Sequence, residues 1–518
     1  MRLRSLREID WTDETVVMQQ ADTNASILVP FPSSLDPNDP LRWPTHKKNI
    51  AFVSVCAFTF LTNYAIAGLA PAFYVLSKQF DKSMTETSQL LLYPILVLGA
   101  FNFFWVPMAN YFGKRPVFVF SSGLLCACYV WGATAQSFKS LLWSNITAAF
   151  AGSAIEALGA SIVNDLFFLH ERGAKMGIYM NSIAGGNTIG PLVCGFIVSN
   201  LSWRWHKSIA AILVGINFLC VVFFVPETRY DRTEKTEKGH TSRSNSQDKT
   251  APPDVTSVRR MSDDSVPTQM PQKTFAQDLK LWSGTPETNL FKMFLRPFPM
   301  IAYPAVMYSF LTYSISLVVV IAVNILNPFV LQKPPYSWKP EINGLINIPG
   351  LVGNVFGAWA GGNLADMWCK HRTKIGNGIY DPESRLHLLI TPFLLTTGGC
   401  ILFGYGVDET LGWVSLFFGY GMISVALTAI PTVTLAYVSD CALAVNSDAF
   451  LLVSGLKNIV AFGFLFGIIP WAEEAGFVEI FGTMAGVFVG VVGVGAVLLI
   501  AFGARVRHAS NSWKIILE

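Results

Sequence analysis

The sequence has 518 residues, of which 52% are hydrophobic and 14% are charged, and its formal net charge is +3. A composition this apolar is unusual for a soluble chain and indicates an integral membrane protein. The small net charge says little by itself, and we expect no nucleic-acid partner.

The apolar residues are clustered in runs with few or no charges. Each run is about 18 to 25 residues long, enough to cross the hydrocarbon layer of a bilayer as a helix. The runs predict an all-α integral membrane protein with twelve transmembrane helices that is embedded in the lipid bilayer. They cover residues 49–71, 88–109, 116–135, 141–163, 177–199 and 207–225 in the first half, and 298–323, 341–364, 386–406, 411–438, 449–472 and 477–503 in the second.

The charges between these runs predict the orientation of the chain. Alternate connections are basic, at residues 113–115, 170–175 and 370–385, whereas residues 408–409 and 473–474 make two of the opposite connections acidic. Because Lys and Arg accumulate on the cytoplasmic side, both termini are predicted to be cytoplasmic.

One basic connection does not fit this pattern, and the N-terminal segment is polar. The basic segment at residues 203–207 falls on the outer side and counts against the charge pattern. The first 46 residues are polar and show no signal peptide, so we expect the first transmembrane helix to direct the chain to its membrane, for which the plasma membrane is our expectation.

A polar segment separates the two sets of six runs. It is poor in apolar residues and cannot bury enough surface to fold alone. Near its end, residues 275–282 have an amphipathic pattern that predicts a short helix at the membrane surface. Ser262 is a candidate phosphorylation site, although a solvated polar run is the favoured interpretation. The predicted domains are a cytoplasmic N-terminal tail (1–48), a six-helix bundle (49–225), a cytoplasmic linker (226–297), a second six-helix bundle (298–503) and a cytoplasmic C-terminal tail (504–518).

Charged motifs stand at matching places in the two halves. A Gly-Lys-Arg segment at 113–115 follows the second run and Asp165 closes the fourth, while Asp366 follows the eighth and Asp440 closes the tenth. A carboxylate at the end of a transmembrane helix is costly unless it is paired, so we expect Asp165 to pair with Arg115. Matching halves are typical of a carrier built from repeats. The predicted gating residues are Gly113, Lys114, Arg115, Asp165, Asp366 and Asp440.

The segment Gly-Lys-Arg-Pro at 113–116 resembles the cytoplasmic loop motif of the major facilitator superfamily. That family usually has an aspartate where this chain has Asn110, so we expect the gate to depend more on Asp366. In the fifth run, GGNTIGPLVCG at 185–195 resembles the antiporter motif of the same superfamily. The resemblance implies close helix packing and a kink at the proline, with packing alone as the alternative. The motif residues are Gly186, Gly190, Pro191 and Gly195.

Further segments are similar to a fungal branch of the drug:proton antiporters, which also contains the histidinol and polyamine transporters. The resemblance implies a major facilitator fold of two pseudo-symmetric six-helix bundles, with protons and a small molecule as the transported partners, and it specifies no substrate. The segments are DPNDPLRW at 36–43, DLFFLHERG at 165–173, PET at 226–228, RPF at 296–298 and DPESRL at 381–386.

Polar residues inside the predicted transmembrane helices are candidate substrate and proton sites. Glu156 lies mid-span in the fourth run, eight positions beyond Ala148, where the superfamily commonly has an arginine. Burial favours the protonated form of a carboxyl group, so Glu156 is the candidate for proton coupling, with a structural hydrogen bond as the alternative. Lys457 is either a mobile counter-charge or extends to the cytoplasmic surface. The further candidates, for which bonding between helices is an equal alternative, are Asn63, Tyr64, Asn181, Asn187, Asn324 and Asn327.

The motifs together predict a proton-coupled secondary transporter of small organic compounds that works by alternating access. Export of drugs, toxins or organic cations is favoured, as in a multidrug antiporter. The alternatives are import of polyamine-like or histidinol-like cations, and a membrane sensor that does not transport. We expect the transporter to function as a monomer.

An intramembrane enzyme is the main alternative from another class. All seven histidines lie in predicted loops or at the ends of runs, so no buried cluster offers a metal site or a general base. The sequence contains no Gly-x-x-x-x-Gly-Lys-Ser/Thr loop, which argues against a nucleotide-driven pump. We therefore predict no catalytic residues, no metal and no cofactor.

Overall fold

The computed structural model describes residues 38–229, 274, 277, 279–280, 290–332, 336–375, 381–441 and 446–511. The first 37 residues, most of the polar linker with Ser262 and most of the amphipathic segment at 275–282, and the last seven residues lie outside the described residues. Within the described ranges, all regular secondary structure is helical.

The helices of the first half begin and end at residues suited to those places. For example, α3 starts with a capping box, in which the Ser83 hydroxyl and the Glu86 carboxylate each accept a hydrogen bond from the other's backbone N–H. The helices are η1 (Pro40–Arg42), α1 (Thr45–Ala67), η2 (Ala70–Ala72), α2 (Phe73–Phe80), α3 (Met84–Phe112), α4 (Lys114–Thr134), α5 (Phe138–Leu166), α6 (Leu169–Asn200) and α7 (Trp203–Phe224).

The second half contains more interruptions than the first. Its helices are α10 (Leu290–Leu295), η3 (Phe298–Ala302), α11 (Pro304–Leu331), α12 (Pro340–Leu345), α13 (Asn347–Trp359), η4 (Ala360–Leu364), α14 (Ala365–Ile375), η5 (Pro382–Leu389), α15 (Ile390–Asp408), α16 (Trp413–Cys441), α17 (Asn446–Leu465), α18 (Ile468–Ala475), α19 (Phe477–Phe488), η6 (Val489–Val494) and α20 (Gly495–Asn511). Of these, η4 and η6 are short π-helical segments inside longer helices.

Eleven helices in the described part of the chain are long and apolar enough to cross a membrane. They correspond to eleven of the twelve predicted runs. The eighth predicted run, 341–364, is divided among α12, α13 and η4. Pro349 explains the first division, because it has no N–H to donate to the carbonyl of residue 345, where α12 ends. The eighth passage is therefore built from shorter helical pieces.

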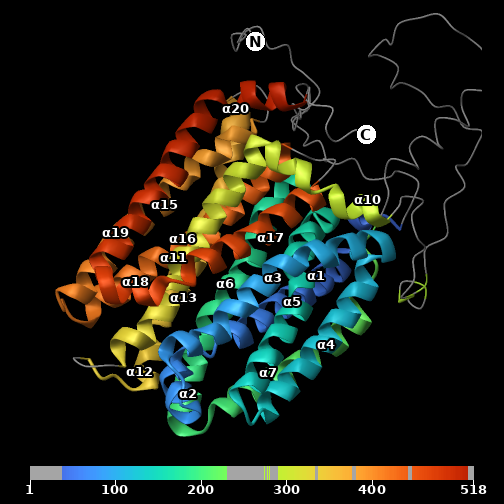
Figure 1. Cartoon of the computed structure of the whole chain (residues 1–518). Helices are drawn as coiled ribbons and strands as arrows, with labels where there is room; N and C mark the ends of the chain where they lie inside the picture. The colour runs from blue at the N-terminus through green and yellow to red at the C-terminus, as the bar shows by residue number, and fades with distance from the viewer. Residues whose placement is uncertain are drawn as a thin grey trace, which may run out of the picture.

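The helices form two groups that follow the two halves of the sequence. Figure 1 shows α1 to α7, coloured blue to green, together on one side and α11 to α20, coloured yellow to red, on the other. We call the end where α1 begins and α20 finishes the terminus end, and the end that carries α2 and α12 the far end. The two groups meet where α17 packs on α3 and α5, and where α6 packs on α12, α13 and α16.

Glycines allow α6 to approach its neighbours closely. A Cβ atom on Gly186 or Gly190 would lie 2.4 Å from a backbone oxygen of α1. On the opposite side of α6, a Cβ on Gly177 would lie 2.8 Å from the carbonyl of Ala358, and one on Gly195 would lie 2.6 Å from that of Pro340. The small residues of α6 therefore bring its backbone against both halves of the protein.

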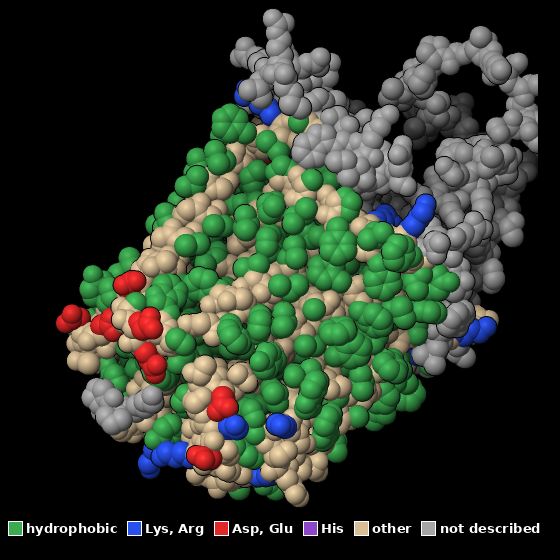
Figure 2. Space-filling model, in the orientation of Figure 1, with side chains coloured by type: hydrophobic (Ala, Val, Ile, Leu, Met, Phe, Trp, Pro, Cys, Tyr) green, Lys and Arg blue, Asp and Glu red, His purple; other side chains and the backbone are tan. Residues whose placement is uncertain are grey.

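The surface agrees with a membrane location. Figure 2 shows hydrophobic side chains over the middle of the visible face, with the charged side chains gathered toward its two ends. The exposed apolar residues include Trp143 on α5, Phe223 on α7 and Leu394 on α15. An apolar belt between charged ends is the pattern that a bilayer requires.

Candidate functional site

An ion pair buried between the two halves is the centre of the site. Glu156 of α5 and Lys457 of α17 are 301 residues apart in the sequence, and Lys457 Nζ donates a short hydrogen bond to Glu156 Oε1. Their side chains are only 8% and 1% exposed. Asn458 donates from Nδ2 to Glu156 Oε2 at 2.8 Å and accepts from Lys457 at 3.1 Å. Both carboxylate oxygens are thus engaged, and Lys457 points into the protein as a counter-charge.

Two tyrosines support this pair. Lys457 Nζ lies 4.6 Å from the ring centroid of Tyr313 in α11, which is a favourable place for a cation. Tyr179 in α6 donates its hydroxyl proton to the backbone carbonyls of Glu156 at 2.8 Å and Ile155 at 3.0 Å. Residues from α5, α6, α11 and α17 therefore position the two charges together.

The ion pair lines a small cavity of about 30 Å³ between the two halves. Apolar side chains from α1, α3, α6 and α11 form much of its wall, including Ile66, Leu91, Ile183 and Leu317. This lining matches a molecule with an apolar body and a polar or charged group, and the two halves must separate to admit anything much larger than water. Its polar lining residues are Asn63, Glu156, Asn187, Asn324, Lys457 and Asn458.

The cavity brings together five of the eight residues predicted to contact substrate or protons: Asn63, Glu156, Asn187, Asn324 and Lys457.

The other three predicted residues lie elsewhere. Tyr64 stacks on the ring of His206 at a centroid distance of 4.7 Å. Asn327 lines a smaller space of about 10 Å³ toward the far end. Asn181 lies in α6, and its side-chain oxygen is buried with no hydrogen-bond partner.

Three charged residues link the helices at the terminus end. Arg385 of η5 donates from Nη1 to Asp366 Oδ1 at 2.9 Å and from Nε to Asp440 Oδ2 at 2.8 Å. Asp366 Oδ2 also accepts a hydrogen bond from the backbone N–H of Ala174 in α6 at 3.0 Å, which joins the two halves. Burial raises the pKa of Asp366, although Arg385 and the Ala174 N–H oppose that shift. Arg385 is thus the shared partner of Asp366 and Asp440, which the sequence motifs did not indicate.

A second bridge at the terminus end uses Arg172, from the segment that resembles the fungal branch. Its Nη1 donates to the hydroxyl of Ser439 in α16 at 3.2 Å, and that hydroxyl donates to Asn164 Oδ1 in α5 at 3.3 Å. This chain crosses from the first half to the second and back. It strengthens the closure made by Asp366 and Ala174.

Asp165 has a different partner from the expected Arg115. Lys114 Nζ donates to Asp165 Oδ2 at 2.5 Å and to the Ser161 hydroxyl at 2.6 Å. Arg115 instead donates from Nη2 to the carbonyl of Val222 in α7 at 2.7 Å, and from Nη1 to the carbonyl of Val225, the residue that follows α7. Because α4 begins at Lys114, consecutive basic residues point to different neighbours, α5 and α7.

Glu227, in the Pro-Glu-Thr segment at 226–228, caps the start of α4. Its carboxylate accepts hydrogen bonds from the backbone N–H groups of Lys114 and Arg115, both at 3.1 Å. These are orphan donors at the start of α4, which a carboxylate stabilises. Gly113 precedes them with φ of 107°, a conformation that favours glycine. The loop motif and the end of the sixth run therefore form one cap.

The far end is also bridged. Gln332, at the end of α11, donates from Nε2 to the carbonyl of Pro71 in η2 at 3.0 Å. The backbone N–H of Glu341 in α12 donates to the Ser199 hydroxyl of α6 at 3.2 Å. The two halves are therefore in contact at both ends of the central cavity.

Lys207 is both the first residue of the sixth predicted run and the last of the basic segment at 203–207, and the structure places that whole segment inside α7. Lys207 is fully buried there, and its Nζ donates to the carbonyl of Ala65 at 2.9 Å and to Asn145 Oδ1 at 2.8 Å. Its neighbour His206 is also fully buried, beneath Gly68 and Tyr64. The basic segment that conflicted with the charge pattern therefore contributes a lysine to the interior rather than to the outer surface.

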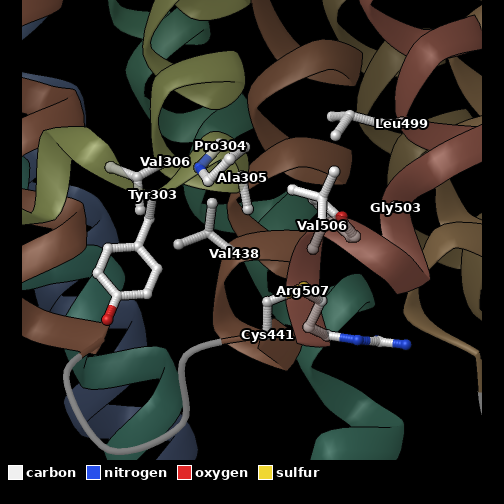
Figure 3. Close-up of a pocket in the computed structure, with 11 residues that line it drawn as sticks. Tyr303, Pro304, Ala305, Val306, Val438, Cys441, Leu499, Gly503, Val506 and Arg507 are labelled. Carbon is white, nitrogen blue, oxygen red and sulfur yellow. The ribbon is translucent and has the colours of Figure 1, made fainter. Parts of the chain in front are cut away.

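A second cavity, of about 30 Å³, lies at the terminus end between α11, α16 and α20 (Figure 3). Its lining is mostly apolar, and its charged residue, Arg507, is paired with Glu383 at 3.4 Å. In the part of the chain that the structure describes, no group of three His, Cys, Asp or Glu side chains is arranged to hold a metal ion. The central cavity is the better candidate.

Comparison with known proteins identifies the family. Residues 53–442 match the model of the Major Facilitator Superfamily. An uncharacterized MFS-type transporter of Schizosaccharomyces pombe is 25% identical over 87% of this chain and 83% of the relative. Protein HOL1 of Saccharomyces cerevisiae is 23% identical over 94% of this chain and 91% of the relative. A probable efflux pump of Aspergillus flavus is 23% identical over 76% of this chain and 88% of the relative.

A solved structure supports the same assignment at the level of fold. The crystal structure of the human organic anion transporter MFSD10 aligns with a TM-score of 0.58 over 88% of this chain and 100% of that chain, at 15% identity. The two groups of helices, the family match and this shared fold agree with one another. The chain belongs to the major facilitator superfamily, and it is a secondary transporter rather than an enzyme.

Proposed function

We propose that this transporter couples the movement of small organic cations to protons and exports them by alternating access. The observation that carries the proposal is the buried Glu156 carboxylate, paired with Lys457 where the two halves meet. A carboxylate inside a membrane protein is costly to bury and is a functional candidate by default. Here it lines a small cavity of mixed apolar and polar lining where the two halves meet.

The two closures support alternating access. Asp366 and Ala174 join the halves at the terminus end, and Gln332 and Pro71 join them at the far end. Opening either set alone would expose the cavity to one side of the membrane. The arrangement with the halves in contact at both ends is the intermediate through which the transported molecule passes from one side to the other.

The names of relatives support the direction of transport. One relative is a probable efflux pump of Aspergillus flavus, and another is an efflux pump of Gibberella fujikuroi that is 24% identical over 89% of this chain. We further propose a plasma-membrane location, cytoplasmic termini and a monomeric functional unit. The charge pattern of the loops supports the cytoplasmic termini, and a cavity formed within one chain supports the monomeric unit.

Transport in yeast tests the proposal. Cells that lack their own drug exporters would express this chain and be loaded with labelled organic cations, polyamines and neutral drugs. Loss of a labelled cation that stops when a proton uncoupler is added supports proton-coupled export. Accumulation that stops with the uncoupler would show import instead. Transport that is unaffected by the uncoupler would contradict proton coupling.

A further inference from the structure

We propose that Lys457 carries the exchanged proton, and that the cargo is a monovalent organic cation that replaces the Lys457 ammonium group on Glu156. This inference rests on the proposed function, because it assigns the coupling to a residue and names the class of cargo. It differs from the simpler expectation that Glu156 itself is protonated and deprotonated in each cycle.

The charges that line the cavity balance one another. Glu156 and Lys457 are the ionisable residues that line it, so the lining carries one negative and one positive charge. The other polar lining residues are neutral amides, and α3 contributes apolar side chains. The nearby hydroxyls belong to Tyr313, below Lys457, and to Tyr179, which donates to the Glu156 carbonyl. One cation is therefore balanced, and a second is not.

Both carboxylate oxygens of Glu156 already have hydrogen-bond partners. Lys457 holds Oε1 of Glu156, and Asn458 holds Oε2 at 2.8 Å. Lys457 also donates to Asn458 Oδ1 at 3.1 Å, and its side chain is 1% exposed. A cationic cargo that approaches Glu156 therefore meets Lys457 and Asn458 already bound to the two carboxylate oxygens. Replacing the lysine exchanges one ion pair for another, whereas replacing Asn458 would leave two cations on one carboxylate.

Once displaced from Glu156, Lys457 has no counter-charge among the described residues that line the cavity. A charged ammonium group without a counter-charge is very unfavourable in a water-poor cavity. Lysine can respond by losing its proton, which arginine does not do. Cargo binding therefore forms the pair between the cargo cation and Glu156, while the Lys457 ammonium group becomes a neutral amine and its proton leaves to water on the open side. On the other side of the membrane the cargo leaves, and Lys457 takes up a proton and pairs with Glu156 again.

This exchange keeps the site neutral in both loaded forms. One proton moves against one monovalent cation, so no net charge crosses the membrane. The single carboxylate of Glu156 balances one positive charge, which favours a monovalent amine or quaternary ammonium ion with an apolar body over a polyamine. An uncharged alcohol of the same shape cannot displace Lys457.

Proton release on binding tests the proposal directly. The full chain would be purified in detergent, placed in weakly buffered solution with a pH-sensitive dye, and titrated with 2-phenylethylammonium and tetraphenylphosphonium. 2-Phenylethanol and spermidine serve as neutral and polycationic comparisons. We expect about one proton released per monovalent cation bound to the wild type, with spermidine bound at least about tenfold more weakly, since its extra charges find no partner.

Lys457→Arg separates the possible proton carriers, because it keeps a positive charge beside Glu156. It should bind the monovalent cations at least about tenfold more weakly and release no proton, because the guanidinium group stays charged and holds Glu156. Lys207→Met, which removes a different buried lysine, should keep the release. Size-exclusion profiles and melting curves show whether each variant is folded.

The outcomes distinguish this inference from the proposed function. If Lys457→Arg binds the cations as tightly as the wild type and still releases a proton, Glu156 carries the proton, so the inference is wrong and proton coupling stands. If the wild type binds a monovalent cation with no proton release, proton coupling itself fails. If neither monovalent cation binds, or if spermidine binds more tightly, the cargo class is wrong.

Discussion

The backbone N–H of Ala174 in α6 donates a hydrogen bond of 3.0 Å to the side chain of Asp366 in α14, although the two residues are 192 positions apart. Arg385 holds the other oxygen of this carboxylate at 2.9 Å. A side chain anchored in the second half thus binds the beginning of a helix in the first half. This contact forms the part of the terminus-end closure that can be altered most simply.

Gly173→Ala should open the terminus end. A Cβ atom at Gly173 would lie 2.2 Å from Asp366 Oδ1, so the carboxylate and α6 must separate. The measurement is the distance between spin labels at the exposed positions Glu171 and Lys374, in a background without native cysteines. We expect the distribution to shift to longer distances. Gly463→Ala is the matched control, since nothing lies within 4 Å of the added atom. An unchanged distribution in Gly173→Ala would contradict the role of this contact.

Acidic pH should favour closure at the same end. Asp366 lies beyond the eighth membrane passage, and burial raises its pKa in the closed form above the ordinary value of an aspartate. A group with a raised pKa takes up its proton first in the closed form, so closure gains stability as the pH falls through the interval between the raised and the ordinary values. The spin-label distance measured against pH should show this change. Asp366→Asn should remove it, and an identical pH profile in both proteins would count against the assignment.

Lys114, rather than Arg115, should be energetically coupled to Asp165. The pair Lys114 and Asp165 is partly buried and joined at 2.5 Å. A double-mutant cycle with Lys114→Met and Asp165→Leu should give a coupling of about 1 kcal/mol or more in unfolding experiments. The cycle with Arg115→Met and Asp165→Leu should give a smaller value, because Arg115 donates to α7 carbonyls. Equal couplings would show that the two basic residues share the carboxylate.

Lys207→Met should destabilise the first half. It leaves Asn145 Oδ1 and the carbonyl of Ala65 without the donor that they share, at a cost of about 1–3 kcal/mol for each unsatisfied group. The melting temperature in detergent should fall measurably. Adding Asn145→Leu removes one of the stranded acceptors and should recover part of the loss. A variant as stable as the wild type would mean that water or rearrangement satisfies these groups.

Much of the fold could be predicted because the membrane imposes a simple rule on sequence. A bilayer-spanning helix satisfies its own backbone and must be apolar, so the run at 411–438 closely matches α16, Trp413–Cys441. The eighth passage shows the limit of this rule. Its residues are apolar enough, but Pro349 divides the helix, and hydropathy does not register a missing hydrogen-bond donor.

The candidate site was less predictable because its parts come from distant segments. Glu156 and Lys457 could each be selected as polar residues inside transmembrane runs, yet nothing local indicates that they touch across 301 positions. Asn458 was missed, although it is the polar neighbour of Lys457 in a predicted transmembrane run. Lys207 was missed because its acceptors lie on α1 and α5, which only the folded bundle brings to it.

The choice between Lys114 and Arg115 illustrates a different difficulty. Which of two adjacent residues faces α5 depends on where α4 begins. That start is capped by Glu227, which lies 113 positions after Lys114. The motif therefore identifies the basic cluster, while the helix phase that selects the partner of Asp165 is set by a distant residue.

Proton-driven flux in proteoliposomes, compared between the wild type and Glu156→Gln, tests the central claim most directly. With 2-phenylethylammonium and tetraphenylphosphonium as labelled cargo and an imposed pH gradient, the wild type should drive the cation against the proton flow. Glu156→Gln should lose gradient-driven flux by at least about tenfold while remaining folded, because the amide neither pairs with a cation nor supports the charge of Lys457. Undiminished gradient-driven flux in folded Glu156→Gln would contradict the account.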